Sequence, residues 1–88
     1  MASYVTPELY MPSGEKLSSK VVEIIDGVVN KIYSFAGEVS GVRYLPEIYL
    51  STASGLTLLN ELYAVTSTDN TLLYAYTVDA EGLLMPLF

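Results

Sequence analysis

The chain has 88 residues, of which 51% are hydrophobic and 16% are charged, and ten acidic against four basic residues give a net charge of -6. A chain of this length forms a single domain, residues 1–88, and it is too short to enclose all of this apolar material without a partner. The acidic balance disfavours binding to nucleic acid or to a membrane surface. Both need clustered cations, whereas the cations present are scattered, as Lys16, Lys20, Lys31 and Arg43.

Two residue types that usually carry chemistry are missing, because the chain has neither cysteine nor histidine. Disulfides and thiolate metal sites are therefore excluded, and so are the usual zinc ligand and the usual base at neutral pH. The first residues, MASYVTPELY, lack the basic region and apolar core of a signal peptide, and no apolar run is long enough to span a membrane. We expect a soluble protein without metal or cofactor, located in the cytoplasm unless it belongs to a larger particle.

The first element in chain order is an extended N-terminal arm, residues 1–12. It contains Pro7 and Pro12, and proline favours extended backbone both at its own position and at the residue before it. Residues 12–15 then have the composition of a tight turn, in which Gly14 tolerates a positive φ.

Residues 15–36 fit two structures. As a helix, they present one apolar face, made of Leu17, Val21, Ile24, Ile25, Val28, Ile32 and Phe35. As a hairpin, they satisfy the strand preference of their many β-branched residues, and Asp26 and Gly27 match a two-residue type I′ turn. That turn pairs Ile25 with Val28 and Val21 with Ile32. We favour the hairpin, and an α+β fold with a helix at 15–36 is the alternative.

Turn residues recur through the rest of the chain. Residues 42–50 look extended, although Pro46 indicates an edge strand or a bulged one, and residues 71–78 are rich in strand formers. Residues 55–66 have helical spacing, with Ser54 as a candidate cap, and predict at most one short helix. Turn signals at intervals of about 8 to 12 residues are typical of all-β domains. The chain therefore predicts a mainly β fold, a small antiparallel meander or sandwich.

The C-terminal residues 83–88 are apolar and predict either a strand of the protein's own core or an arm that docks on a neighbour. Tyrosine, with eight copies, suits half-buried strand positions and also subunit contacts, because one end is apolar and the other forms hydrogen bonds. The residues predicted to contact other copies are Tyr4, Tyr10, Tyr74, Tyr76, Leu84, Met85, Leu87 and Phe88.

No group of residues predicts catalysis or metal binding. Asp79 and Glu81, the best acidic pair, precede Gly82 and are typical of a polar turn between strands. Ser18 and Lys20 lie close together, but no nucleophile motif surrounds them. We expect no catalytic, cofactor-binding or metal-binding residues, and therefore a protein that is not an enzyme.

The pattern as a whole predicts a structural subunit that self-associates or decorates a larger assembly. The Tyr- and Thr-rich run ELYAVTSTDNTLLYAYTVDAEG, the extended arm and the absence of Cys and His resemble the small accessory virion proteins of tailed bacteriophages, such as decoration or head-fibre subunits. The resemblance implies a location in the virus particle, a trimeric or otherwise symmetric assembly on a capsid, and no catalytic residues. A small acidic regulatory binding module, such as an inhibitor of a host protein, is the alternative.

Overall fold

The computed structural model describes residues 1–37, 41–64 and 72–88 of the chain. These residues form one short helix, α1 (Glu61–Ala64), and the strands β1 (Ala2–Tyr10), β2 (Lys16–Ile25), β3 (Val28–Ser34), β4 (Val42–Tyr44), β5 (Ile48–Ser51), β6 (Tyr74–Val78) and β7 (Leu84–Pro86). The prediction of a mainly β fold with one short helix is confirmed. The strands make a single open sheet in the order β3-β2-β1-β5-β6-β7, and β4 pairs with β1 as well.

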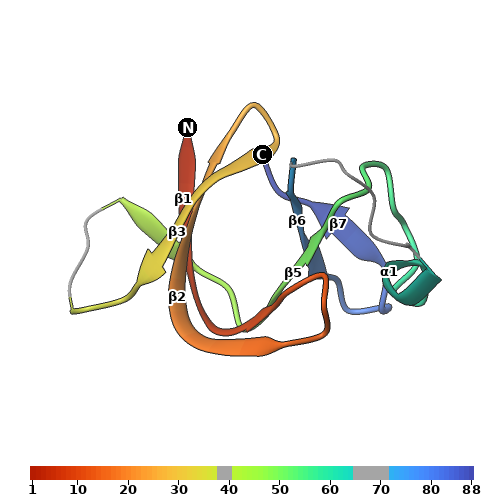
Figure 1. The fold of residues 1–88 in the computed structure, drawn as a ribbon, viewed down its shortest axis with the longest axis horizontal. Helices are drawn as coiled ribbons and strands as arrows, with labels where there is room; N and C mark the ends of the chain where they lie inside the picture. Colours follow the sequence, from red (N-terminus) through yellow and green to blue (C-terminus); the bar gives the residue numbers. More distant parts are fainter. Residues whose placement is uncertain (38–40, 65–71) are drawn as a thin grey trace.

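The sheet is mixed, whereas the turn spacing predicts an antiparallel one. β1 is antiparallel to β2, but it runs parallel to β4 from Ser3 to Val5 and parallel to β5 at Leu9 and Tyr10. The chain leaves β3 at one edge of the sheet and crosses to the far side of β1 (Figure 1). Turn-forming residues do not reveal whether the next strand pairs antiparallel in a hairpin or parallel after a crossover, because both connections begin with the same residue types.

The hairpin at Asp26 and Gly27 is confirmed, and the alternative helix at 15–36 is wrong. Both turn residues have positive φ, 53° and 78°, as a type I′ turn requires. Ile25 pairs with Val28 as predicted. Farther from the turn the register shifts by one residue at a bulge, so that Val21 pairs with Tyr33 instead of Ile32.

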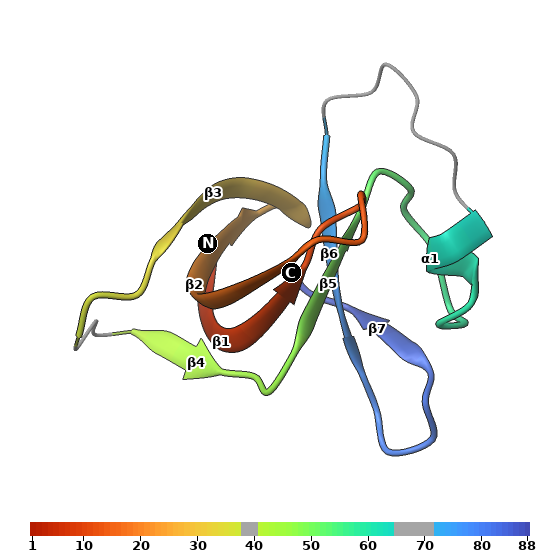
Figure 2. The same ribbon diagram turned by 60° about the horizontal axis from the view of Figure 1, so that its bottom comes forward.

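The long strands β1 and β2 bend halfway along, and the sheet curls round its core at this bend (Figure 1 and Figure 2). Ser19, in the stretch of β2 that faces Pro7, has a φ of 52°, which is unusual inside a strand. At this bend the side chains of β2 that face the core change from odd-numbered to even-numbered positions. Leu17 packs against the core before the bend, and Val22 and Ile24 lie within it after the bend. A flat strand would have put one of the two groups in solvent.

The core lies inside this curl. Its buried residues are Tyr4, Leu9, Val22, Ile24, Ile48, Leu50, Ala75 and Leu87, drawn from the two ends of the chain as well as its middle. The Val29 N–H donates a hydrogen bond to the Leu73 carbonyl, 2.8 Å away, and brings β3 against the residue that precedes β6. Strands that are distant in the order of the sheet therefore meet across a shared interior.

The remaining predicted elements are found in modified form. The extended run 42–50 is divided around Pro46 into β4 and β5, because proline cannot supply an N–H to a continuous ladder. The predicted helical segment 55–66 contains α1, and its last two residues lie outside the described part of the chain. Residues 2–10, within the predicted arm, form β1, which pairs on both of its edges. Residues 84–86 form β7, antiparallel to β6.

We predict that Ser19→Val lowers the free energy of unfolding by about 1–2 kcal/mol, because a β-branched side chain is strained at positive φ. The matched control is Ser18→Val at the neighbouring exposed position, where the change should stay within about 0.5 kcal/mol. Urea denaturation followed by circular dichroism measures both variants. Equal effects of the two substitutions would contradict the role assigned to Ser19.

Candidate functional site

A row of aromatic side chains crosses the sheet at the end of β1. Tyr10 pairs with Tyr49 of β5, and Tyr49 pairs in turn with Tyr76 of β6. Partners in register lie side by side on one face, so the three rings are neighbours. The rings of Tyr10 and Tyr49 stack with centroids 4.7 Å apart and planes 10° from parallel. This stacked pair is half-buried, whereas Tyr76 is only 1% exposed.

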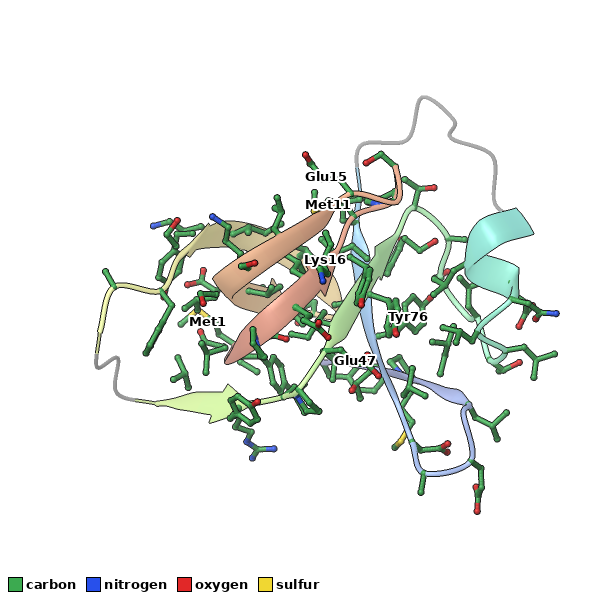
Figure 3. All side chains as sticks on the ribbon, turned by 90° about the horizontal axis from the view of Figure 1, so that it is seen from below. Met1, Met11, Glu15, Lys16, Glu47 and Tyr76 are labelled. Carbon is green, nitrogen blue, oxygen red and sulfur yellow. The ribbon has the colours of Figure 1, made fainter. Side chains whose placement is uncertain are left out.

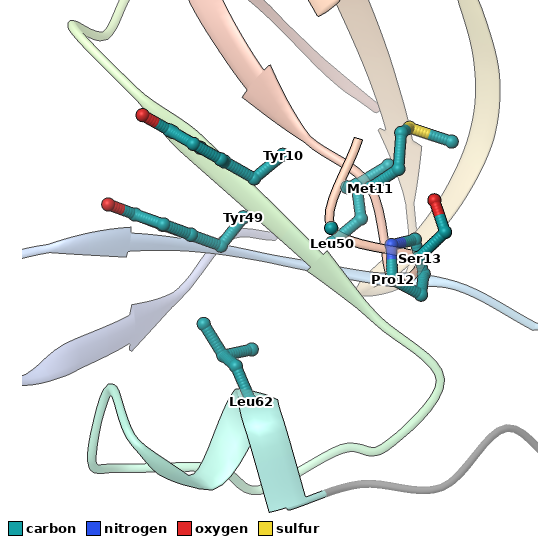
Figure 4. Close-up of a pocket in the computed structure, with 8 residues that line it drawn as sticks. Tyr10, Met11, Pro12, Ser13, Tyr49, Leu50 and Leu62 are labelled. Carbon is teal, nitrogen blue, oxygen red and sulfur yellow. The ribbon is translucent and has the colours of Figure 1, made fainter. Parts of the chain in front are cut away.

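Beside the stacked pair the surface is hollowed. One hollow of about 380 Å³ is lined by Tyr10, Met11, Pro12, Ser13, Gly14, Tyr49, Leu50 and Leu62. A second, of about 430 Å³, shares five of these residues and continues past them to Glu15, Ser51, Thr52 and Leu73. We call the two together the tyrosine groove. In Figure 4 the two rings lie parallel with their hydroxyl groups at the same end, and Leu62 points towards them from α1.

The first wall of the groove is the β1–β2 turn, where Met11 and Glu15 lie together (Figure 3). The Met11 N–H donates to the Glu15 carbonyl at 2.8 Å, and the Gly14 N–H donates to the Met11 carbonyl at 2.9 Å. Gly14 has a φ of 91°, which closes the turn at no steric cost, as predicted for this position. The predicted turn thus becomes a rigid wall that presents Met11 and Pro12 to the groove.

The opposite wall is the segment from Ala53 to α1, which Tyr76 fixes in place. The Tyr76 hydroxyl donates to the Ala53 carbonyl at 2.7 Å and accepts from the Leu56 N–H at 3.4 Å. Burial raises the pKa of Tyr76, because the charged phenolate would lose its hydration. A tyrosine from the middle of a strand therefore anchors the loop that carries Leu62.

Glu61 organises the start of α1. Its carboxylate accepts hydrogen bonds from the Leu58 N–H at 2.7 Å, the Thr57 N–H at 3.0 Å and the Thr57 hydroxyl at 3.2 Å. An acid that reaches back to free amides at a helix start forms half of a capping box. The amides of Leu58 and then Thr57 hold the pKa of Glu61 below its usual value. The acid that sets the position of Leu62 is in this way kept ionised.

The border of the groove is acidic. Glu15 lines it at one end, and at the other the Tyr49 hydroxyl donates to a Glu47 carboxylate oxygen 3.0 Å away. Among the described residues that line the groove, none is Lys or Arg. Lys16, next in register to Tyr10, forms an ion pair with Glu8 at 3.5 Å. The groove therefore combines an apolar floor with carboxylates that attract cations.

The groove presents apolar side chains, with carboxylates near its border. In the described part of the chain no three acidic residues come together to hold a metal ion, and every buried side-chain polar atom has a hydrogen-bond partner. None of the helices in the described residues has the length and apolar content needed to cross a membrane.

The residues predicted to contact other copies fall into two groups. Tyr4, Tyr76, Leu84 and Leu87 are buried and hold the protein's own fold together. Tyr10 and Tyr74 are half-buried, and Met85 and Phe88 are exposed, so these four retain surface that a partner can reach. The structure brings Tyr10 into the tyrosine groove, and it places Tyr74 and Phe88 beside a separate hollow near Gly27.

The two polar motifs singled out in the sequence serve the local structure. An Asp79 carboxylate oxygen accepts from the N–H groups of Glu81 and Leu83, both at 2.9 Å, which closes the β6–β7 turn predicted there. The Lys20 ammonium donates to the Ser34 hydroxyl at 2.9 Å across the β2–β3 ladder, and Ser18 is exposed. None of these residues lines the tyrosine groove.

Sequence reasoning missed most of the groove. Tyr49, Leu50 and Leu62 belong to segments that approach Tyr10 only through the crossover into β5. The available signal was the tyrosine content of residues 44–49, which follows strand propensity and does not reveal which strand lies opposite. Contacts between residues this distant in the chain leave no local pattern.

We predict that Tyr76→Phe lowers the free energy of unfolding by about 0.5–1.5 kcal/mol, because the Ala53 carbonyl loses its donor. The pKa of Tyr76 is raised in the folded state. Its contribution to the free energy of unfolding is therefore fully present below the usual tyrosine pKa of 10.0, and it is lost as the pH rises through the raised pKa. Chemical denaturation at neutral and alkaline pH should therefore show a smaller alkaline loss for Tyr76→Phe than for the wild type. Identical alkaline losses would contradict the anchoring role.

We predict that Glu61→Gln destabilises the fold most at neutral pH. Because the folded-state pKa of Glu61 is lowered, its contribution is present above the usual value of 4.5 and disappears as the pH falls through the lowered pKa. Unfolding curves of wild type and Glu61→Gln should therefore differ at pH 7 and converge in acid. Glu81→Gln, on an exposed turn, is the control and should differ little from wild type at either pH.

No protein-family model, curated protein sequence or solved structure matches the chain. Two features of the molecule bear on its function, the tyrosine groove and the apolar side chains that remain exposed.

Proposed function

We propose that the protein is a non-enzymatic structural subunit that associates with copies of itself through the outer face of β1–β4. The observation that carries the proposal is an aromatic patch on that face. It stands apart from the tyrosine groove, with which it shares no lining residue.

The patch follows one row of the sheet. Tyr44 of β4 pairs with Val5 of β1, Val5 pairs with Val21 of β2, and Val21 pairs with Tyr33 of β3. Residues in register share a face, so these four side chains form a continuous stripe. Val21 is fully buried, but it is not part of the central core cluster, which agrees with a position on the opposite side of the sheet.

Phe35 extends the stripe just beyond β3. With Val5, Pro7 and Tyr44 it borders a shallow hollow of about 230 Å³. Tyr44 is 66% exposed and Phe35 is 38% exposed, which is unusual for two aromatic side chains that lie beside one hollow. We call Val5, Val21, Tyr33, Phe35 and Tyr44 the outer patch. Its exposed part is made by Phe35 and Tyr44 with the half-buried Val5 and Tyr33, and exposed apolar side chains grouped in this way are typical of protein–protein contacts.

The small interior also supports association. Among the described residues, eleven hydrophobic residues are buried, while nine large hydrophobic side chains remain exposed. The radius of gyration is 12.2 Å. That value agrees with the roughly 12 Å expected for a compact domain of this length. The exposed apolar groups are therefore not the result of loose folding, and covering them by another copy would lower the free energy through the hydrophobic effect.

The virus-particle setting of the proposal is supported by the compositional resemblance alone. An accessory virion subunit would use the outer patch for contacts within a symmetric oligomer. Its acidic residues would face outwards and keep the assembly soluble. The part of the sequence from residue 45 onwards carries Glu47, Glu61, Asp69, Asp79 and Glu81 and no basic residue.

The second candidate function, a small acidic binding module, is favoured by one specific observation. The tyrosine groove is an apolar cleft with carboxylates at its border, a combination that suits recognition of another protein. The two functions do not exclude each other, because they use different surfaces.

We predict that wild-type protein forms a trimer or another discrete symmetric oligomer at micromolar concentration, and that the double variant Phe35→Ser, Tyr44→Ser is monomeric. Light scattering coupled to size-exclusion chromatography measures both masses. The variant should keep its free energy of unfolding to within about 1 kcal/mol, because both side chains are substantially exposed.

The matched control is the double variant Leu58→Ser, Leu83→Ser, which removes two exposed apolar side chains that lie outside the outer patch. It should retain the mass of the wild type. A monomeric wild type would contradict the structural-subunit proposal, and an oligomer that resists the Phe35 and Tyr44 substitutions would contradict the choice of surface.

A further inference from the structure

The tyrosine groove has the size and the continuity of a binding site. Its two overlapping hollows, about 380 Å³ and 430 Å³, run from the stacked tyrosine pair to Leu73. Ligand sites typically fall between about 300 and 1,000 Å³. The groove lies between the β1–β2 turn and α1, with the stacked tyrosines on the same side as Leu62 (Figure 4).

The floor and walls favour apolar, extended ligands. Met11 and Pro12 line one wall and Leu62 lines the other, while Leu50, also in the lining, is buried in the core. Grooves lined by aromatic and aliphatic side chains recognise extended peptides through proline and aliphatic side chains, because such segments lose little conformational entropy on binding. The anchored positions of Leu62 and of the turn mean that the groove is formed before a ligand arrives.

The charge of the border favours a cationic ligand. The hydrogen bond from Tyr49 holds the Glu47 carboxylate at the hydroxyl end of the tyrosine pair, and Glu15 lines the other end of the groove. The faces of tyrosine rings attract Arg and Lys side chains, and a nearby carboxylate adds to that attraction. The nearest cation in register, Lys16, is already paired with Glu8. A net charge of -6 also speeds the approach of a basic partner.

We infer that the tyrosine groove binds an extended segment of a partner protein in which basic residues alternate with proline or aliphatic residues. The basic side chain lies against the stacked rings of Tyr10 and Tyr49, next to Glu47. The aliphatic or proline side chains of the segment pack on Met11 and Leu62, which are half-buried. This function is additional to self-association, because the outer patch and the groove share no lining residue.

The test uses the acetylated hexapeptide amide Leu-Pro-Arg-Leu-Pro-Arg as the probe and amide chemical shifts in NMR as the readout. The full-length wild type and the Phe35→Ser, Tyr44→Ser variant are both titrated, so that self-association does not decide the result. We expect saturable shifts in the β1–β2 turn and in β5. The peptide Leu-Pro-Glu-Leu-Pro-Glu should give no saturable shifts, because it reverses the charge.

Two substitutions separate the groove from general charge attraction. Glu47→Gln should weaken binding of the probe by about twofold to fivefold, the range expected for a partly exposed ion pair. Glu81→Gln removes the same charge on the β6–β7 turn and should leave the affinity unchanged. Equal losses for the two variants, shifts that map outside the groove, or no saturable shifts with the arginine peptide would each overturn the inference.

Discussion

The bend shared by β1 and β2 is the constraint on which the molecule depends. A single sheet of seven strands has two faces, and a chain of 88 residues cannot cover both. The bend at Ser19 lets the sheet curl round one face, which is then covered. It also changes which side chains of β2 face the core, from Leu17 before the bend to Val22 after it. On the other face Phe35 and Tyr44 remain exposed beside the half-buried Val5 and Tyr33, and this patch is the basis of the proposed contact with a second copy.

The same bend creates the tyrosine groove. Beyond it, β1 turns towards β5, and Tyr10 reaches Tyr49 in the parallel pairing. The turn after β1 then projects beside β5, opposite the segment that Tyr76 anchors. Core, outer patch and groove are thus three consequences of one change of direction, and a substitution at Ser19 would affect all of them together.

The parts of this structure that could be read from the sequence are those with a local cause. Asp26 and Gly27 accept positive φ, and Pro46 interrupts a ladder, whatever the rest of the chain does. The pairing of Leu9 with Ile48 has no such cause, and neither has the burial of Tyr4 and Tyr76. In the described part of the chain, tyrosines with the same strand propensity serve as core, anchor, groove or surface residues, and their roles depend on which strand lies opposite. For that reason, half of the residues predicted to contact other copies are buried inside the protein's own fold: Tyr4, Tyr76, Leu84 and Leu87.

The two ends of the chain meet at one place. The N and C ends lie near each other in Figure 1. The Tyr4 hydroxyl donates to the Phe88 carbonyl at 3.4 Å, and Met1 and Phe88 line the same hollow. A short peptide joining the ends would therefore close the backbone into a ring without disturbing β1 or β7. Any domain fused to either end would leave the molecule from a single corner, so fusions at the two ends would compete for the same space.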